Sequence, residues 1–529
     1  MNSPLLARLT ALRSDRIAVA DDTGARTFAQ LLDSAAAIAS VLRERASVSP
    51  GDRVALLASS GTSWVEAFFG ILFAGAVAVP LSPSYPPVEL AWFASDSRAR
   101  AVIFSADQAD RASLMLHDRT PLPLEELISA AHTPHEAPHQ AAAQTPPQTP
   151  PQPTPPTPLL PPDLAPSSTA LLLYTSGTTG KPKGAMITHA NVALQAQLLR
   201  EAWSFSETDT LLHALPLHHL HGLGISFFTS LLAGATTRML PRFDAARIWT
   251  EMAAGRATVW MAVPTMYQKL FEALDSAPRE QARTWEKGAA SLRLATSGSA
   301  ALPVRLAERW RTLTGTIPLE RFGMTEIGVG LTNPLTPESR RPGWVGRPPR
   351  TVEVRLIDET GSDIDSGEGE LLIRGPSVFA GYWDRPEATR SAFRDDGWFI
   401  TGDRAERAPD GTIRLLGRTS VDILKSGGYK LSALEIEEVL RSHPAVREVA
   451  VVGLPDETWG ERVVAAIVPE PGRDSDLATD AVRTWAKDLI APYKIPREIH
   501  LLPTLPRNAL GKVVKPDLIK LLNRSPQAS

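Results

Sequence analysis

The chain has 529 residues, of which 43% are apolar and 21% are charged, and its formal net charge is −3. These values are typical of a globular protein with more than one core, and they give no reason to expect nucleic acid or an anionic membrane as a partner. Cysteine is absent, which excludes disulfides, thiolate metal sites and cysteine nucleophiles, and no apolar run approaches the length of a membrane-spanning helix.

The first residues do not have the pattern of a secretion signal. The segment 1–13 lacks the apolar core that such signals require. Arg8 and Arg13 precede the first acidic residue, Asp15, which is a weak similarity to a mitochondrial presequence. We therefore expect the cytoplasm, with the mitochondrial matrix as the alternative if the source is eukaryotic.

The first part of the chain alternates between helical and strand patterns. Thr27 is an N-cap residue ahead of a stretch with helical apolar spacing. The elements expected next are a strand at 54–58, helices at 63–74 and 87–97, and strands at 77–80 and 101–105. Strands that alternate with helices predict a layered α/β domain with parallel strand pairing.

A proline-rich stretch interrupts this pattern between residues 131 and 166. It carries much of the chain's total of 46 prolines. Proline continues neither helices nor central strands, so we expect a disordered, extended surface insertion. A docking site for a partner protein is the alternative.

A glycine-rich segment follows the apolar run 169–173, which indicates a buried strand. It reads Y-T-S-G-T-T-G-K-P-K-G from Tyr174 to Gly184. Glycine lets the backbone approach a ligand, hydroxyls and N–H groups donate to phosphate oxygens, and lysine supplies charge. It is not a Walker loop, because Pro182 follows Lys181 where Ser or Thr is required. We predict a phosphate-binding loop, and a solvated turn is the alternative.

The α/β alternation continues to about residue 300 and then changes. Between 345 and 417 short strands separated by Gly and Asp clusters predict a small antiparallel sheet or barrel. The last hundred or so residues predict an α+β unit that is large enough to fold alone. The predicted fold class is therefore α/β, with a large N-terminal domain of layered subdomains and a small β-barrel-like part at 1–421, and a small mobile α+β domain at 422–529.

Five further motifs follow the glycine-rich segment. They are E-R-F-G-M-T-E (Glu320–Glu326), Y-W-D-R-P-E-A-T (Tyr382–Thr389), W-F-I-T-G-D (Trp398–Asp403), G-R-T-S-V-D (Gly417–Asp422) and P-R-N-A-L-G-K (Pro506–Lys512). Together they resemble the adenylate-forming superfamily of acyl-CoA synthetases, adenylation domains and luciferases, over nearly the whole chain apart from the proline-rich insertion. The resemblance implies an enzyme that joins a carboxylate to AMP, releases pyrophosphate and passes the acyl group to a thiol, using ATP, Mg²⁺ and CoA.

The resemblance also implies an ATP site. The phosphates would be bound by Thr175, Ser176, Gly177, Thr178, Thr179, Gly180, Lys181 and Lys183. Ser299, Phe322 and Gly323 would form the adenine slot. Asp403 would accept from the ribose hydroxyls, with Arg418 beside it; a simple turn residue is the alternative for Asp403.

The chemistry explains the remaining residue types of these motifs. A carboxylate must attack an anionic α-phosphate, so positive charge and preorganised donors are needed. By resemblance, Thr325 donates to the α-phosphate, Glu326 holds Mg²⁺, and Lys512 bridges the carboxylate and the α-phosphate. An exposed acid and a surface lysine are the alternatives for Glu326 and Lys512.

Lys512 lies far along the chain from the other motifs, on the predicted C-terminal domain. The resemblance implies that this domain alternates between two orientations about a hinge at Asp422. It also implies that Gly427, Gly428, Tyr429 and Lys430 line the CoA site.

Within the superfamily, the stretches 213–223, 293–303, 320–328 and 418–430 are most similar to malonyl-CoA synthetases. A dicarboxylic acid leaves a second carboxylate inside the protein, and a buried anion needs a paired cation. The resemblance implies that Arg293 binds this carboxylate, and that Ser297, His219 and Met324 complete the acyl site. The alternative is that Arg293 points to solvent.

We therefore predict an acid–thiol ligase for a short dicarboxylic acid, malonate first, with small-molecule substrates as its partners. The close alternatives are a CoA ligase for another short or substituted acid, such as methylmalonate or a medium-chain or aryl acid, and an adenylation enzyme that loads a carrier protein. The absence of a phosphopantetheine attachment domain favours free CoA. A nucleotide sensor without activity is a further alternative, against which the presence of Lys512, Glu326 and Asp403 argues.

Overall fold

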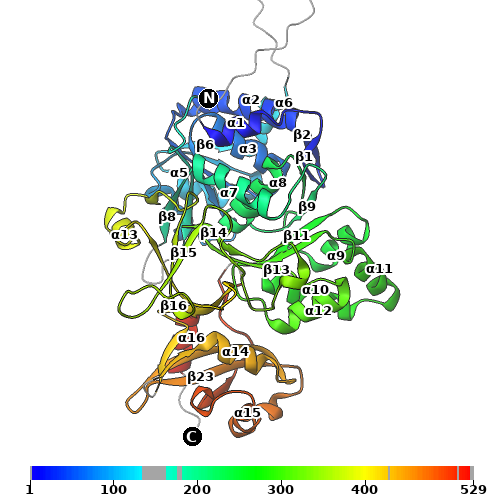
Figure 1. Cartoon of the computed structure of the whole chain (residues 1–529). Helices are drawn as coiled ribbons and strands as arrows, with labels where there is room; N and C mark the ends of the chain where they lie inside the picture. The colour runs from blue at the N-terminus through cyan, green and yellow to red at the C-terminus, as the bar shows by residue number, and fades with distance from the viewer. Residues whose placement is uncertain (1–2, 134–161, 176–181, 427–428, 509–510, 525–529) are drawn as a thin grey trace, which may run out of the picture. The chain divides into compact units, whose positions relative to one another are not determined.

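The computed structural model describes residues 3–133, 162–175, 182–426, 429–508 and 511–524. Figure 1 traces the chain from its blue N-terminus to its red C-terminus. Contacts divide it into two compact units, Met1–Phe243 with Pro376–Pro386, and Asp244–Gly375 with Glu387–Ser529. Most of the predicted proline-rich insertion lies outside the described residues. The predicted boundary between residues 421 and 422 stays a prediction.

The first unit contains a seven-stranded mixed sheet. Its strands, in spatial order, are β17 (Gly381–Tyr382), β8 (Lys183–Thr188), β7 (Thr169–Thr175), β4 (Val77–Leu81), β3 (Arg53–Leu57), β5 (Ala99–Phe104) and β6 (Thr120–Pro123). The strands from β7 to β6 pair in parallel, whereas β8 and β17 are antiparallel. Every residue of β4 is buried, as expected for a parallel strand that is covered on both faces.

Further strands and the helices complete the first unit. The strands run in the order β9 (Thr210–His213), β10 (Thr236–Met239), β1 (Ile17–Asp21) and β2 (Gly24–Thr27). The helices are α1 (Pro4–Thr10), α2 (Phe28–Ala46), α3 (Thr62–Phe73), α4 (Pro87–Asp96), α5 (Ala109–Leu116), α6 (Leu124–His132), α7 (His189–Ala202), the π-helix η2 (His221–Phe227) and α8 (Phe228–Leu232). This layered arrangement confirms the predicted α/β class.

Side-chain caps explain where two of these helices begin. The Thr27 hydroxyl accepts from the backbone N–H of Gln30, whose side chain accepts in turn from the Thr27 N–H. Thr188 and Asn191 form the same reciprocal pair at the start of α7. Each pair satisfies N–H groups that a helix start leaves without partners.

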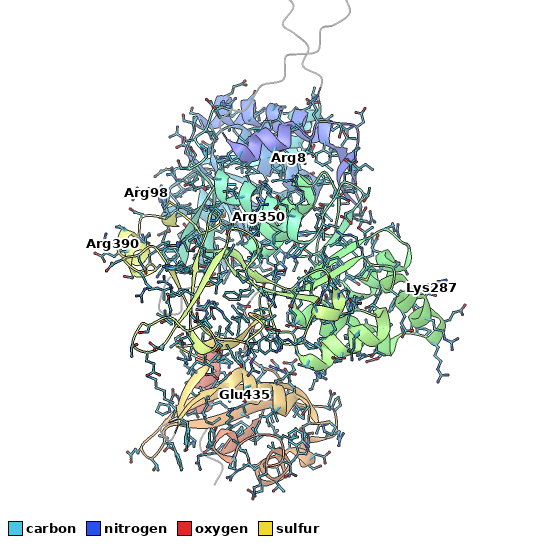
Figure 2. The ribbon with its side chains drawn as sticks, in the orientation of Figure 1. Arg8, Arg98, Lys287, Arg350, Arg390 and Glu435 are labelled. Atoms are coloured by element: carbon cyan, nitrogen blue, oxygen red, sulfur yellow. The ribbon has the colours of Figure 1, made fainter. Side chains whose placement is uncertain are left out.

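Several arginines satisfy backbone carbonyls where helices of the first unit end. Arg53 donates to the carbonyls of Ser97 and Arg98 just after α4, and Arg100 donates to the Ala46 carbonyl at the end of α2. Arg98, labelled in Figure 2, pairs with Asp384 at 2.6 Å. Cations are favoured at helix C-termini. The ends of α4 and α2 therefore explain the positions of Arg53 and Arg100.

The second unit begins with an α/β layer. Its strands are β11 (Val259–Ala262), β12 (Leu294–Ser297), β13 (Leu319–Met324) and β14 (Gly328–Thr332), and its helices are α9 (Ala245–Ala253), α10 (Pro264–Ser276), α11 (Arg279–Ala289) and α12 (Val304–Thr314). Strands β11, β12 and β13 are parallel, and β13 and β14 form an antiparallel hairpin. In the helical layer the Trp249 ring stacks on Trp285 at 6.2 Å and on Trp310 at 6.1 Å.

A four-stranded antiparallel sheet follows, as predicted. Its strands, in spatial order, are β15 (Glu353–Ile357), β16 (Gly367–Arg374), β18 (Phe399–Arg407) and β19 (Ile413–Arg418), and the short helix α13 (Pro386–Ser391) lies between β16 and β18 in the sequence. Register places Asp403 of β18 opposite Arg418 of β19.

The C-terminal part of the second unit has the predicted α+β character. Its elements are β20 (Ile423–Ser426), β21 (Tyr429–Ser432), α14 (Ala433–Arg441), β22 (Val446–Asp456), β23 (Gly460–Pro469), α15 (Thr479–Ala486), β24 (Glu498–Leu501) and α16 (Lys515–Arg524). Val449 and Val451 of β22 pack in one apolar cluster with α14 and α15, whereas Val452 packs in another with α16. The alternation of side chains along β22 therefore joins helices to both faces of this sheet.

None of the helices in the described ranges is both long and apolar enough to cross a bilayer.

Buried histidines predict a pH-dependent stability. Burial lowers the pKa of His189 and of His213 to about 4, whereas the ordinary value is about 6.5. Below about pH 6.5 the unfolded chain binds protons that the folded chain does not bind until about pH 4, so the unfolding free energy falls as the pH falls through this window. Each such histidine contributes a slope of up to about 1.4 kcal/mol per pH unit.

We expect the thermal midpoint to fall between pH 7.5 and pH 5, and to fall less in His189→Asn. The matched control is His117→Asn, which changes a histidine whose side chain is 82% exposed. An equal pH dependence in the two variants would contradict this assignment.

Candidate functional site

The predicted phosphate-binding loop connects two antiparallel strands of the first unit. Thr175 at the end of β7 lies opposite Lys183 at the start of β8. The Lys183 ammonium lies 5.1 Å from the centre of the Tyr382 ring. The predicted ligands Ser176, Gly177, Thr178, Thr179, Gly180 and Lys181 lie outside the described residues. The structure therefore places the two ends of this loop, Thr175 and Lys183, opposite each other.

Tyr174, just before the loop, is anchored at both its ring and its hydroxyl. Its phenol donates to Asp96 at 2.9 Å, and the other Asp96 oxygen accepts from Arg385 at 2.6 Å. Its ring packs against Phe93 with 4.6 Å between centroids. This contact network holds the strand from which the loop begins.

His219 lies in the same unit, just ahead of the π-helix η2. Protein atoms around its ring lower its pKa to about 4, although the residue is partly exposed. Its Nε2 has no hydrogen-bond partner among the described residues. At neutral pH His219 is therefore uncharged. Its ring can donate a hydrogen bond to a ligand or accept one from it, but it does not supply a positive charge. π-Helical turns are frequent at functional sites.

In the second unit, the E-R-F-G-M-T-E motif forms β13 and the turn to β14. Phe322 and Gly323 lie at an irregularity in the β13–β14 pairing. A Cβ on Gly323 would lie 2.3 Å from the Gly328 carbonyl oxygen, so this close approach requires glycine. Thr325 and Glu326 follow Met324 in the tight turn, and Glu326 is buried.

Asp403 and Arg418 form a partly buried ion pair across β18 and β19. Arg418 Nε lies 3.4 Å from Asp403 Oδ1, and Arg418 Nη2 lies 4.0 Å from the Met324 sulfur. Burial raises the pKa of Asp403, which the charges of Arg418 and Lys512 partly offset. Asp403 Oδ2 has no hydrogen-bond partner in the part of the chain that is described. It is thus available to accept from a ligand's hydroxyl groups.

Lys512 is brought close to the same group of charges. Surrounding protein atoms and the charge of Arg418 lower its pKa, whereas Asp422 and Asp403 act in the opposite direction; the residue as a whole remains exposed. The charge of Glu326 also acts on Asp403. Residues predicted from four separate motifs are therefore neighbours within the second unit.

The segment Ser297–Gly298–Ser299 ends β12 at the carboxyl edge of the parallel strands. The Ser297 hydroxyl is buried and has no hydrogen-bond partner among the described residues. Ser299 is exposed and has a φ of +71°, a value that is uncommon for residues other than glycine and is often found at functional sites.

Arg293 lies at the other end of the same strand. It directly precedes β12, its backbone N–H donates to the Thr258 carbonyl at 2.8 Å, and its side chain is exposed. Five residue steps separate its Cα from that of Gly298, which is roughly 16 Å of extended chain. Its predicted role in binding a buried carboxylate at the Ser297 end stays a prediction, and the structure points to another cation there.

That cation is Arg321, which the sequence analysis did not single out. Arg321 is 3% exposed, and its guanidinium packs against Gly298, where a Cβ would lie 2.3 Å from Arg321 Cζ. Its Nε and Nη2 have no hydrogen-bond partner within the described ranges, and burial lowers its pKa to about 9. A buried guanidinium with free donors is a site for an anion. The signal in the sequence was an arginine inside an otherwise buried strand.

The predicted hinge and CoA residues lie at the start of the C-terminal part. Asp422 accepts from the Arg418 backbone N–H and pairs with Lys515. The Tyr429 ring is half exposed and stacks on Tyr493 with 4.3 Å between centroids. Gly427 and Gly428 lie outside the described residues, and Lys430 is placed only by its backbone in β21.

The chain matches two models of one enzyme family. Residues 7–383 match the model described as AMP-binding enzyme, and residues 435–512 match that of the AMP-binding enzyme C-terminal domain.

Curated relatives and solved structures match over almost the whole chain. The mitochondrial malonate–CoA ligase of Mus musculus is 41% identical, over 99% of this chain and 92% of its own. ATP-bound MatB from Rhodopseudomonas palustris is 33% identical with a TM-score of 0.85, over 99% of both chains. A malonyl-CoA ligase complex with methylmalonyl-CoA and AMP is 35% identical with a TM-score of 0.66, over 95% of this chain and all of the other. These matches confirm the resemblance found in the motifs, and the chain belongs to the AMP-binding enzyme family.

Proposed function

We propose that this protein is an AMP-forming acid–thiol ligase that converts malonate to malonyl-AMP and then to malonyl-CoA. The observation that carries the choice of acid is Arg321, a buried cation whose Nε and Nη2 have no hydrogen-bond partner in the described ranges and which packs against Gly298, the residue after Ser297. A methyl-terminated or aryl acid would leave this charge uncompensated, whereas the second carboxylate of malonate would pair with it. Relatives named malonate–CoA ligases, similar over nearly the full chain, support the same substrate.

The first half-reaction requires two anions to meet. A carboxylate oxygen of malonate attacks the α-phosphorus of ATP, the bond to the β-phosphate oxygen breaks, and pyrophosphate leaves. Lys512 lowers the repulsion between these groups, and Thr325 donates to the α-phosphate. The free Asp403 Oδ2 accepts from the ribose hydroxyls. The loop that begins at Thr175 and ends at Lys183 binds the β- and γ-phosphates.

The residues present fit a magnesium ion that arrives with ATP. Among the described residues no three carboxylate or imidazole groups form a metal cluster, while Glu326 supplies one buried carboxylate. Mg²⁺ is commonly held by one or two carboxylates together with substrate phosphates. Bound there, it would supply positive charge to the triphosphate, and Glu326 would hold it.

The second half-reaction transfers the acyl group. The CoA sulfur attacks the acyl carbon, and AMP leaves. Lys512 is not needed in this step, so we propose that the C-terminal domain turns about Asp422 and presents Tyr429 and the neighbouring glycines to CoA. For the compartment we propose the cytoplasm, with the mitochondrial matrix as the alternative; the mouse relative is named as mitochondrial.

The choice of acid is tested by ATP–pyrophosphate exchange on a panel of acids. We expect exchange with malonate, and much less with acetate, octanoate or benzoate. Methylmalonate in the same panel measures the tolerance for a branch. An absence of exchange with every acid would contradict the proposed function.

A pair of arginine variants tests which cation binds the second carboxylate. Arg321→Met should lower kcat/KM for malonate by about a hundredfold or more, because a charge-assisted pair is lost, and change it little for acetate. Its thermal midpoint should not fall, since a buried unpaired cation is removed. Arg293→Ala is the matched control. A selective loss of malonate use in Arg293→Ala, and not in Arg321→Met, would transfer the role to Arg293.

Gly298→Ala tests the contact between Gly298 and Arg321. The new methyl group would lie 2.3 Å from Arg321 Cζ, so the guanidinium must move, and the preference for malonate over acetate should fall at least tenfold. Because both changes act on one group, the double variant with Arg321→Met should have the selectivity of Arg321→Met alone. Additive losses in the double variant would contradict a shared role.

Lys512→Ala separates the two half-reactions. It should reduce ATP–pyrophosphate exchange with malonate by at least a hundredfold and leave thioester formation from supplied malonyl-AMP within about threefold of wild type. Rapid-quench measurement of each half-reaction checks this. Equal loss of both would count against the proposed domain alternation.

A further inference from the structure

Lys515, the first residue of α16, makes two ion pairs inside the protein. Its Nζ lies 2.5 Å from Asp422 Oδ1 and 2.8 Å from Glu437 Oε1. The residue is 8% exposed. Although burial acts to lower it, the charges of Glu437 and Asp422 raise the pKa of Lys515. Lys515 is therefore a buried, protonated link between α16, α14 and Asp422, which directly precedes β20.

Both partners of Lys515 are held in place by other contacts. Asp422 Oδ2 accepts from the Arg418 N–H at 3.0 Å. Glu437 Oε1 accepts from the Val451 N–H at 2.9 Å, and Glu437 Oε2 accepts from Arg441 at 3.0 Å. The two carboxylates thus have contacts besides Lys515 that hold them in place. A lysine between two fixed acids has a defined position.

The chain is shaped to bring Asp422 to this point. Gly417 has a φ of +122°, and a Cβ there would lie 2.3 Å from Asp422 Cβ. Only glycine combines this conformation with so close a contact. The carboxylate of Asp422 therefore turns back against the end of β19, where Arg418 pairs with Asp403.

Lys512 stands three residues before Lys515 in one short segment. The Lys512 N–H donates to Asn508 Oδ1 at 3.0 Å, and its carbonyl accepts from the Asn508 N–H at 2.9 Å. The Val514 N–H donates to the Pro506 carbonyl at 2.9 Å. These bonds tie Lys512 to Asn508 and Val514 to Pro506. The ion pairs of Lys515 fix where the segment lies relative to Asp422.

We propose that Lys515 is a positioning residue for Lys512, and that its ion pairs with Asp422 and Glu437 hold Lys512 beside Asp403 and Arg418 for the adenylation half-reaction. This rests on the proposed function. Lys515 touches no reacting atom in this role. It acts through the segment that carries Lys512, so its removal affects the half-reaction that uses Lys512 and spares the one that does not.

The test measures both half-reactions in Lys515→Met. We expect ATP–pyrophosphate exchange with malonate to fall at least tenfold, and thioester formation from supplied malonyl-AMP to stay within about threefold of wild type. Lys515→Arg, which keeps the charge and both pairs, should recover most of the exchange. Lys520→Met is the matched control on the same helix, because its pair with Asp517 is exposed, and it should change neither half-reaction.

A second variant addresses folding. Lys515→Met leaves Asp422 without its lysine partner and Glu437 paired only with Arg441, so the double variant Lys515→Met/Glu437→Gln removes the buried Glu437 charge as well. It should recover thermal stability relative to Lys515→Met without recovering the exchange. A double variant that recovers both would show that Lys515 only stabilises the fold.

The outcomes separate this proposal from the proposed function. Loss of exchange in Lys512→Ala with full exchange in Lys515→Met would overturn the positioning role and leave the ligase intact. Parallel losses of both half-reactions in Lys515→Met would also overturn it. Absence of exchange in the wild-type protein with every acid would instead contradict the proposed function itself.

Discussion

A charge inside a protein is stable only where opposite charges or hydrogen-bond donors surround it, and the second unit is organised by this requirement. Asp403 is paired with Arg418, and Asp422 and Glu437 are paired with Lys515. Arg321 does not follow the pattern: its Nε and Nη2 have no hydrogen-bond partner among the described residues. The paired charges fix this part of the chain, and in the proposed function the Arg321 guanidinium pairs with the negative charge of the substrate.

Much of the fold could be predicted from local signals. The cap predicted at Thr27 marks a helix start correctly because a hydroxyl that accepts from an N–H three residues on is a local interaction. The short antiparallel strands between residues 345 and 417 were also predicted correctly. Strand β8 was not predicted. Only six residues lie between the glycine-rich loop and the next helix, and they form a strand because they pair with β7.

The site was predicted less completely, for a geometric reason. Motifs place Glu326, Asp403 and Lys512 in one neighbourhood, but they do not say which end of a strand faces the ligand. Arg293 directly precedes the buried strand β12 and Arg321 lies within β13, and only the register of β12 with β13 puts Arg321 beside Gly298. Lys515 carried no signal, because its partners Asp422 and Glu437 are distant in sequence. Long-range pairing was the missing information in each case.

The stacked indoles of Trp249, Trp285 and Trp310 have a spectroscopic consequence. Their rings lie within about 19° of parallel to the central one, and aromatic side chains fixed in this way give near-ultraviolet circular dichroism that disappears when packing is lost. The stacked tryptophans of α9, α11 and α12 therefore contribute a spectroscopic signal that reports on the packing of this layer. Its melting can be followed without attaching a dye.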